Sequence, residues 1–150
     1  LRRMEAEGLL AGQDVPWGPR GSKREYTISA AGLESFRVWM NEPIAYAVER
    51  NPAHLKAAYL EWSSPHSARN ILTAHREHYQ ERLEDWSAKL HEINTMTNPL
   101  IRKRMEKFPA EDHEKIIAYK AFTYEGLIAR AEVEILWANR GLALVDQLNA

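Results

Sequence analysis

The chain has 150 residues, a formal net charge of −1 at pH 7, 45% hydrophobic residues and 27% charged residues. A chain of this length can bury a hydrophobic core, and its near-neutral charge means that any DNA-binding surface must be local. The absence of cysteine excludes disulfides and thiol chemistry, and no apolar run approaches the roughly 18 residues of a membrane span.

The first expected element is a helix over residues 1 to 8, which Gly8 ends and a strand follows. Arg2 and Arg3 lie in this helix. Their charges could simply face water, or they could contact phosphate from the back of a recognition helix, because phosphate contacts usually flank base-reading residues. Both interpretations stay open, and we include the two arginines among the candidate DNA-binding residues.

The next expected element is a β-hairpin wing. A Pro- and Gly-rich loop over residues 11 to 22 precedes a short strand over residues 23 to 28, and Arg20, Lys23 and Arg24 crowd the end of the loop. Cations at this place can contact the DNA backbone or the minor groove, whereas the alternative is an ordinary polar hairpin. We favour phosphate contacts for Arg20 and Lys23. We include Arg24, although strand alternation directs it toward the core face.

The strand is expected to lead directly into an amphipathic helix over residues 30 to 40, with Ser29 as its N-cap. Gly32 in the first turn lowers helix propensity, so we expect another backbone segment to pass close to it. Pro43 ends the helix, and residues 41 to 52 are then expected to form a linker with short helical content.

This linker divides the chain into two predicted domains, residues 1–43 and residues 44–150. The expected fold class is mainly α. The first domain is the C-terminal part of a winged helix-turn-helix domain with a β-hairpin wing. The second is a helical dimerisation or effector domain with a short helix over residues 53 to 62 and coiled-coil-like helices over residues 65 to 95 and 111 to 148.

Both long helices carry regular apolar stripes. In the first long helix the stripe consists of Leu72, Tyr79, Leu83, Trp86, Leu90 and Ile93. In the second long helix an unbroken stripe with steps of four and three residues, called the 4-3 stripe below, consists of Ile117, Ala121, Tyr124, Ile128, Ala131, Ile135, Ala138, Leu142 and Val145.

The second long helix is too long for one small domain to cover. At about 38 residues it would be on the order of 57 Å long. We therefore predict a homodimer whose interface comes mostly from the two long helices. The expected interface residues are Leu83, Trp86, Leu90, Tyr124, Ile128, Ala131, Ile135, Ala138, Leu142 and Val145.

Three motifs in the first domain resemble the PadR family of bacterial transcriptional regulators. They are Leu-x-x-Met-Glu-x-Glu-Gly-Leu-Leu at residues 1–10, Arg-Glu-Tyr-Thr-Ile-Ser-x-x-Gly at residues 24–32 and Phe-x-x-Trp-x-x-Glu-Pro at residues 36–43. The second domain is similar to the larger members in its helical architecture. Ser29 stands where the family usually has Thr. The chain begins inside what would be the recognition helix, so we expect it to be part of a longer protein.

The resemblance implies a dimeric regulator, a repressor in our interpretation, that binds a near-palindromic operator in double-stranded DNA. Some PadR-like proteins are released from DNA by small aromatic or drug-like molecules. For such an effector we expect a pocket near the domain junction, lined by Trp39, Tyr46, Tyr59 and Trp62. The alternative function is a helical dimerisation or protein-interaction module that does not bind DNA.

Motifs of common enzymes are missing, including a Gly-rich phosphate loop, H-E-x-x-H and G-x-S-x-G, so we expect neither an enzyme nor a cofactor. His75 and His78 lie three residues apart on a predicted helix, with Glu81 three residues further. Such a trio can bind zinc from one helical face. We favour the alternative, surface residues on a charged helix, and expect no metal. We also expect a cytoplasmic protein without a membrane partner.

Overall fold

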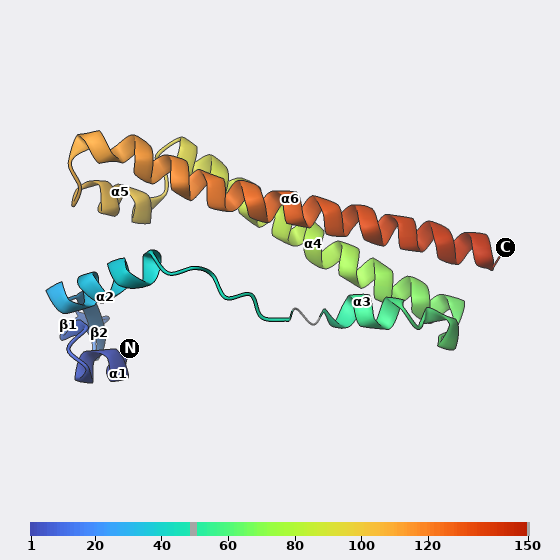
Figure 1. The fold of residues 1–150 in the computed structure, drawn as a ribbon, viewed down its shortest axis with the longest axis horizontal. Helices are drawn as coiled ribbons and strands as arrows, with labels where there is room; N and C mark the ends of the chain where they lie inside the picture. The colour runs from blue at the N-terminus through green and yellow to red at the C-terminus, as the bar shows by residue number, and fades with distance from the viewer. Residues whose placement is uncertain (49–50, 150) are drawn as a thin grey trace. The chain divides into compact units, whose positions relative to one another are not determined.

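The computed structural model describes residues 1–48 and 51–149. It is mainly helical and divides into two compact units, an N-terminal unit over Leu1–Glu49 and a C-terminal unit over Arg50–Ala150 (Figure 1). Each unit is described by itself below. The functional boundary predicted after residue 43 stays a prediction. No helix in the described part of the chain is both long enough and apolar enough to cross a membrane.

The N-terminal unit is a β-hairpin between two helices. Gly8 follows the first helix with a φ of +75°, a backbone conformation that glycine adopts without strain, which confirms its predicted role as a helix stop. The two strands pair antiparallel, with Leu10 opposite Ile28 and Trp17 opposite Gly21. The elements in chain order are α1 (Arg2–Ala6), β1 (Leu10–Trp17), β2 (Gly21–Ile28) and α2 (Ala30–Met40).

The hairpin is longer than the sequence predicted. Most of the expected loop over residues 11 to 22 is strand, and only residues 18 to 20 form the turn, where Gly18 has a φ of +68°. Pro16 did not prevent strand formation, because in a two-stranded sheet each strand has an open edge where a missing N–H costs no ladder hydrogen bond. The expected loop was therefore wrong in extent, although the wing itself is present.

The start of α2 is as predicted. Ser29 is the N-cap, and its Oγ accepts a hydrogen bond from the Gly32 backbone N–H at 3.0 Å. A Cβ at Gly32 would lie 2.0 Å from the carbonyl oxygen of Leu9. This distance confirms the predicted close backbone approach and explains why no larger residue fits there.

The segment between the units differs in part from prediction. Residues 43–48 form neither helix nor strand, so the expected short helical content is wrong there, and residues 49–50 lie outside the described residues. The helix expected over residues 53 to 62 is split into α3 (Pro52–Ala57), which the Asn51 side chain caps, and a 3-10 turn, η1 (Leu60–Trp62).

Three helices complete the C-terminal unit: α4 (Pro65–Asn94), α5 (Pro99–Met105) and α6 (Ala110–Leu148). The two long helices match their predicted ranges within one residue at each end, and they run antiparallel, side by side (Figure 1). Ser64 caps α4 by accepting a hydrogen bond from the Ser67 N–H, and Asn98 caps α5 by accepting from Leu100 and Ile101.

The core of this unit lies between α4 and α6. Ala68, Leu72 and Val145 form one buried cluster toward one end of the pair. Ile93, from the end of α4, forms the other with two residues of α5. Every position of the 4-3 stripe is buried or half-buried in the single chain. The stripe is therefore the face with which α6 packs on its own chain.

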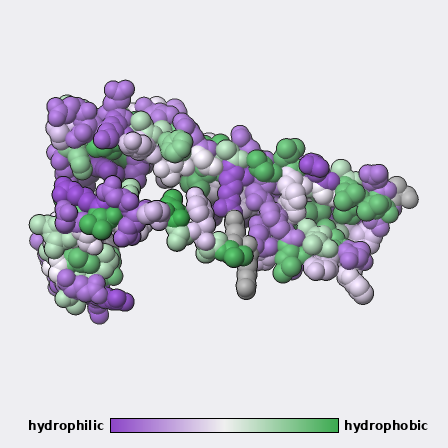
Figure 2. All heavy atoms as spheres, in the orientation of Figure 1, coloured by the Kyte–Doolittle hydropathy of each residue, from purple (hydrophilic) through white to green (hydrophobic). Residues whose placement is uncertain are grey.

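This packing corrects part of the predicted dimer interface. Ala131 and Ala138 are 0% exposed and Val145 is 6% exposed in one chain, so their side chains are not available to a second copy. Their small size instead allows α4 to approach closely. Large apolar side chains remain exposed elsewhere on α6, among polar residues (Figure 2), and they are Tyr119, Phe122, Val133, Leu136, Leu144 and Leu148.

Candidate functional site

The hairpin carries three of the predicted DNA-contacting cations, and two of them, Arg20 and Lys23, lie in or near its turn. Arg20 is exposed in the turn between the strands and has no ion pair among the described residues. Lys23 follows on β2, pairs with Glu25 at 2.8 Å and lies over the Trp17 ring, with its Nζ 4.4 Å from the ring centroid. The turn end of the hairpin therefore carries two cations, one of which lies over an exposed indole.

Arg24 is bound by other residues of the N-terminal unit. Its guanidinium donates hydrogen bonds to the carboxylate of Glu5 on α1 and to the carbonyl oxygen of Gly12, and it pairs with Asp14 at 3.0 Å. The hydrogen bond to Glu5, followed by the one to Asp14, raises the pKa of Arg24. This arginine joins α1 to both strands, and we leave it out of the proposed DNA surface.

The two arginines of α1 lie on its exposed surface. Arg3 pairs with Glu7 at 2.8 Å, one turn along the helix, and Arg2 is also exposed. Such a surface pair contributes little to stability and leaves the guanidinium accessible. Phosphate contact by either residue stays a prediction.

The four aromatic residues predicted to bind an effector belong to different units. Trp39 lines a cavity of about 240 Å³ in the N-terminal unit, together with Phe36 and Ile28. Tyr46, Tyr59 and Trp62 are 90%, 60% and 86% exposed. Their predicted role in ligand binding stays a prediction.

A larger cavity lies within the C-terminal unit. It has a volume of about 540 Å³ and is open between η1, α4 and α6. Its walls are mainly apolar and include Leu60, Leu72, Trp137 and Val145. A cavity of this size and lining suits a small organic ligand. The sequence did not indicate it, because its wall combines residues far apart in the chain.

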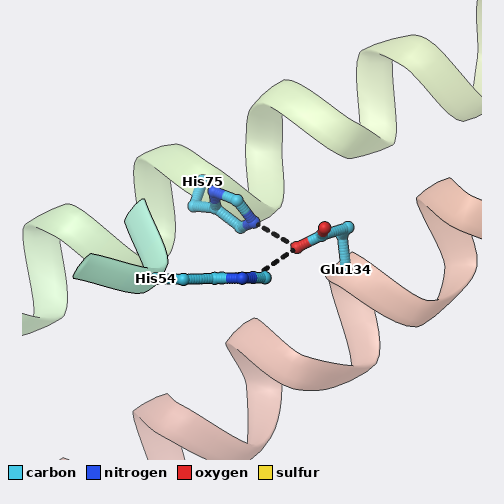
Figure 3. Close-up of side chains that lie close together, drawn as sticks. All are labelled: His54, His75 and Glu134. Atoms are coloured by element: carbon cyan, nitrogen blue, oxygen red, sulfur yellow. Dashed lines mark hydrogen bonds and ion pairs between the residues drawn. The ribbon is translucent and has the colours of Figure 1, made fainter. Parts of the chain in front are cut away.

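The structure also assembles a cluster that the sequence analysis missed (Figure 3). His54 on α3, His75 on α4 and Glu134 on α6 meet at one point. The Nε2 atoms of His54 and His75 lie 3.1 Å and 2.9 Å from the same oxygen, Glu134 Oε2. We call these three residues the histidine cluster.

Helix geometry places each member of the histidine cluster. Asn51 caps α3 just before His54, and His75 lies three residues after the buried Leu72. Glu134 lies between Ala131 and Ala138, on the same face of α6 as these buried residues. An acid on an apolar helical face was the one sequence signal for this site, and no short spacing linked it to the histidines.

The histidine cluster contains a buried carboxylate. Glu134 is 8% exposed and is the only charged residue among the described ones that is buried. Burial raises its pKa, but the hydrogen bonds from His75 and His54 outweigh this effect, so the pKa lies below the usual glutamate value. The carboxylate is thus kept ionised by its two imidazole neighbours.

The metal-binding trio considered from sequence is not assembled. His78 is exposed on α4, its ring lies edge-on to Tyr79 at 5.2 Å, and it does not belong to the group of residues whose ligand atoms converge. Glu81 is exposed as well. Only His75 of the trio enters a potential ligand set, because the partners that surround it come from α3 and α6.

No protein-family profile matches the chain, and neither does any curated protein. Solved structures do match. Bacillus subtilis PadR in complex with operator DNA is 15% identical, with a TM-score of 0.66 over 95% of this chain and 74% of that chain. The same protein in complex with p-coumaric acid is 16% identical, with a TM-score of 0.61 over 97% of this chain and 73% of that chain.

The Vibrio cholerae virulence activator AphA is 17% identical, with a TM-score of 0.64 over 98% of this chain and 74% of that chain. The similarity covers the hairpin and the long helices alike, since almost the whole chain is aligned in each case. The resemblance predicted from the sequence motifs is therefore confirmed at the level of the fold, and the chain has the PadR-like fold.

Proposed function

We propose that this protein is a DNA-binding transcriptional regulator that contacts DNA phosphates through the turn of its hairpin. The observation that supports this proposal is the exposed pair of cations, Arg20 in the turn and Lys23 at its edge, on a PadR-like wing. A solved protein of this fold is in complex with operator DNA. A regulator of this kind works in the bacterial cytoplasm.

The position of these cations on a hairpin fits contact with phosphate. Arg20 is in a short turn and Lys23 is close to it on β2, whereas base reading on winged-helix proteins is mostly the task of a helix in the major groove, and the Lys23 Nζ is held over the Trp17 ring. Each phosphate that a cation neutralises releases condensed counterions, which makes affinity fall with salt. The turn would therefore position the protein on DNA and contribute affinity more than sequence preference.

We further propose that the regulator acts as a homodimer on a near-palindromic operator, because two-fold protein symmetry is matched by two half-sites. The exposed apolar side chains of α6 support the dimer, since monomeric proteins rarely leave so many large apolar groups on one helix in water. The half-buried members of the predicted interface, such as Leu83 and Ile128, would lie at its margin.

An effector would act from the cavity of the C-terminal unit. The complex of Bacillus subtilis PadR with p-coumaric acid is a precedent for a small aromatic ligand on this fold. Here the cavity of about 540 Å³ has apolar walls and one aromatic wall residue, Trp137. A ligand would change DNA affinity only by binding one conformation of the protein better than another.

The proposal is non-enzymatic. One solved protein of this fold is in complex with operator DNA and another is described as a virulence activator, and neither description is that of an enzyme. We expect this regulator to repress transcription. An activator with the same fold is known, so a reporter gene behind the protein's own promoter would distinguish repression from activation.

Fluorescence anisotropy tests the DNA proposal. The protein expressed from its complete gene is titrated onto a duplex from its own upstream region and onto a random duplex, across a salt series. Arg20→Ala and Lys23→Ala should each weaken binding to both duplexes and reduce the slope of log K against log salt by about 0.9. Lys120→Ala on α6 is the matched control, because it removes one exposed cation from the other unit.

Two results would contradict the proposal. Equal salt slopes for the wild type and the hairpin variants would remove the turn from the interface. Binding to its own upstream duplex no tighter than to the random duplex would instead favour the alternative function, a helical module that binds a protein partner.

A further inference from the structure

We propose that the histidine cluster of His54, His75 and Glu134 is a binding site for a divalent transition-metal ion of the zinc class. No metal role was expected from the sequence, and the site differs from the His75–His78–Glu81 face that helical spacing had indicated. The inference does not depend on DNA binding.

The ligand atoms already converge. Both imidazoles direct the same atom type, Nε2, toward Glu134 Oε2, at 3.1 Å and 2.9 Å, and the three ligand atoms lie within 4.8 Å of one another (Figure 3). Around a tetrahedral zinc ion with bonds of about 2.0 to 2.1 Å, neighbouring ligand atoms are roughly 3.3 Å apart. The two nitrogen–oxygen distances are already close to this value, and a movement of the two imidazoles toward each other would complete the arrangement around the ion.

The donor set selects the kind of metal. Two imidazole nitrogens and one carboxylate oxygen suit Zn²⁺ and its neighbours in the first transition row, whereas Mg²⁺ and Ca²⁺ prefer sites made of oxygen atoms. Three protein ligands leave a fourth position open for water or another small ligand. The carboxylate is needed for charge as well, because it neutralises part of the dication in a largely buried place.

The residues around the site restrict the two imidazoles and leave one side open to solvent. The Trp137 ring packs edge-on against His54 at 4.6 Å and against His75 at 5.1 Å, and Tyr79 contacts His75 at 4.9 Å, each measured between ring centroids. These rings restrict how far the imidazoles can turn. The His54 side chain is half exposed, whereas those of His75 and Glu134 are 10% exposed, so an ion can enter from the His54 side.

In the metal-free protein, hydrogen bonds replace the ion. Each imidazole that donates Nε2–H to Glu134 must give up that proton, or move it to Nδ1, before Nε2 can bind a metal. No other bond forms or breaks. The buried carboxylate thus has two stable sets of partners, two N–H groups or one metal ion that bridges the same three side chains.

Metal binding would stabilise α3, the shortest of the three helices that form the site. A helix of six residues such as α3 has little stability of its own, and His54 is its only member of the cluster. A bond from His54 to an ion held by α4 and α6 would fix α3 on the long-helix pair. Because Ala57 of α3 and Trp137 both line the 540 Å³ cavity, the same ion would also order part of that wall.

Isothermal titration of the tag-free, chelator-treated protein with Zn²⁺ alone tests the site, with Co²⁺ absorption as a spectroscopic report of coordination geometry. We expect one ion per chain, an intense visible spectrum for Co²⁺ in four-coordinate geometry, and a higher melting temperature of the C-terminal unit with metal. Loss of an outer-shell partner typically lowers metal affinity by about 10- to 100-fold. His54→Ala, His75→Ala and Glu134→Gln each remove a direct ligand and should lower the affinity for Zn²⁺ by more than this.

The control is His78→Ala, on the same helix as His75 but outside the cluster, and it should bind like the wild type. Circular dichroism identifies any variant that fails to fold. If Glu134→Gln or His75→Ala unfolds, the half-exposed His54→Ala variant decides the matter. Wild-type affinity in His54→Ala, loss of binding in His78→Ala, or no stoichiometric binding by the wild type would each overturn the proposal.

Discussion

A Cβ on Gly32 would lie 2.0 Å from the carbonyl oxygen of Leu9, so α2 passes against the backbone that leads into β1. The same carbonyl accepts a hydrogen bond from the Ser29 N–H at 3.1 Å. The helix therefore joins the hairpin at a backbone contact, which cannot yield to a larger residue as a flexible side chain would.

Gly32→Ala should destabilise the N-terminal unit by on the order of 3 kcal/mol, because the added methyl group must push backbone rather than side chain. Chemical denaturation followed by the fluorescence of Trp17 and Trp39 would measure this effect. The control is Gly126→Ala on α6, where a Cβ meets nothing within 4 Å. Helix propensity predicts that this change stabilises the C-terminal unit by up to about 1 kcal/mol. Equal effects at both glycines would refute the proposed contact.

Ser29→Ala should destabilise the same unit by about 1 kcal/mol or more. Its hydroxyl accepts from the Gly32 N–H and donates to the Gly8 carbonyl oxygen at 2.7 Å, so two backbone groups lose their partner. Ser29→Thr keeps the hydroxyl and should remain within a few tenths of a kcal/mol of the wild type. Urea midpoints of the three proteins provide the test, and a threonine variant as unstable as the alanine variant would argue against capping.

Acid should weaken the N-terminal unit through Glu5. The hydrogen bond from the Arg24 guanidinium lowers the pKa of Glu5. A lowered pKa means that the unfolded chain binds the proton more readily, so this contribution is present above the unfolded pKa and is lost as pH falls through the folded pKa. Denaturation midpoints between neutral pH and about pH 3 should show this loss. Glu5→Gln should be less stable at neutral pH and show a smaller acid dependence.

Leu136→Asp should convert a dimer into a monomer. Leu136 is 60% exposed in one chain, so a charge there costs the single chain little, whereas it would be buried without a partner in a dimer interface formed by this face of α6. Light scattering coupled to size exclusion would report the mass. Lys120→Asp is the control for a new charge on α6. An unchanged dimer in Leu136→Asp would assign the interface to another surface.

The local features of this fold could be predicted from the sequence. Gly8 and Ser29 act on residues within one turn of themselves, so their roles as helix stop and helix cap follow from neighbouring residues in the sequence. Regular apolar spacing likewise located both long helices within one residue of their ends. Such signals are local because helix hydrogen bonds join residues four apart.

Which residues a helix face or a charged side chain contacts, by contrast, depended on tertiary structure. The 4-3 stripe has the same spacing whether it faces α4 or a second chain, and only the packing showed that Ala131 and Ala138 are covered within one molecule. Strand alternation placed Arg24 near the core face, but its partners on α1 and β1 required the hairpin to be closed.

The histidine cluster is the clearest case. His54, His75 and Glu134 are separated by 21 and 59 positions, and each belongs to a different helix. The sequence determined that each helix would form and that Glu134 would lie on an apolar face. That this acid meets two imidazoles there was decided by the antiparallel pairing of α4 and α6 and by the position of α3, since a meeting point of three helices exists only after they have packed.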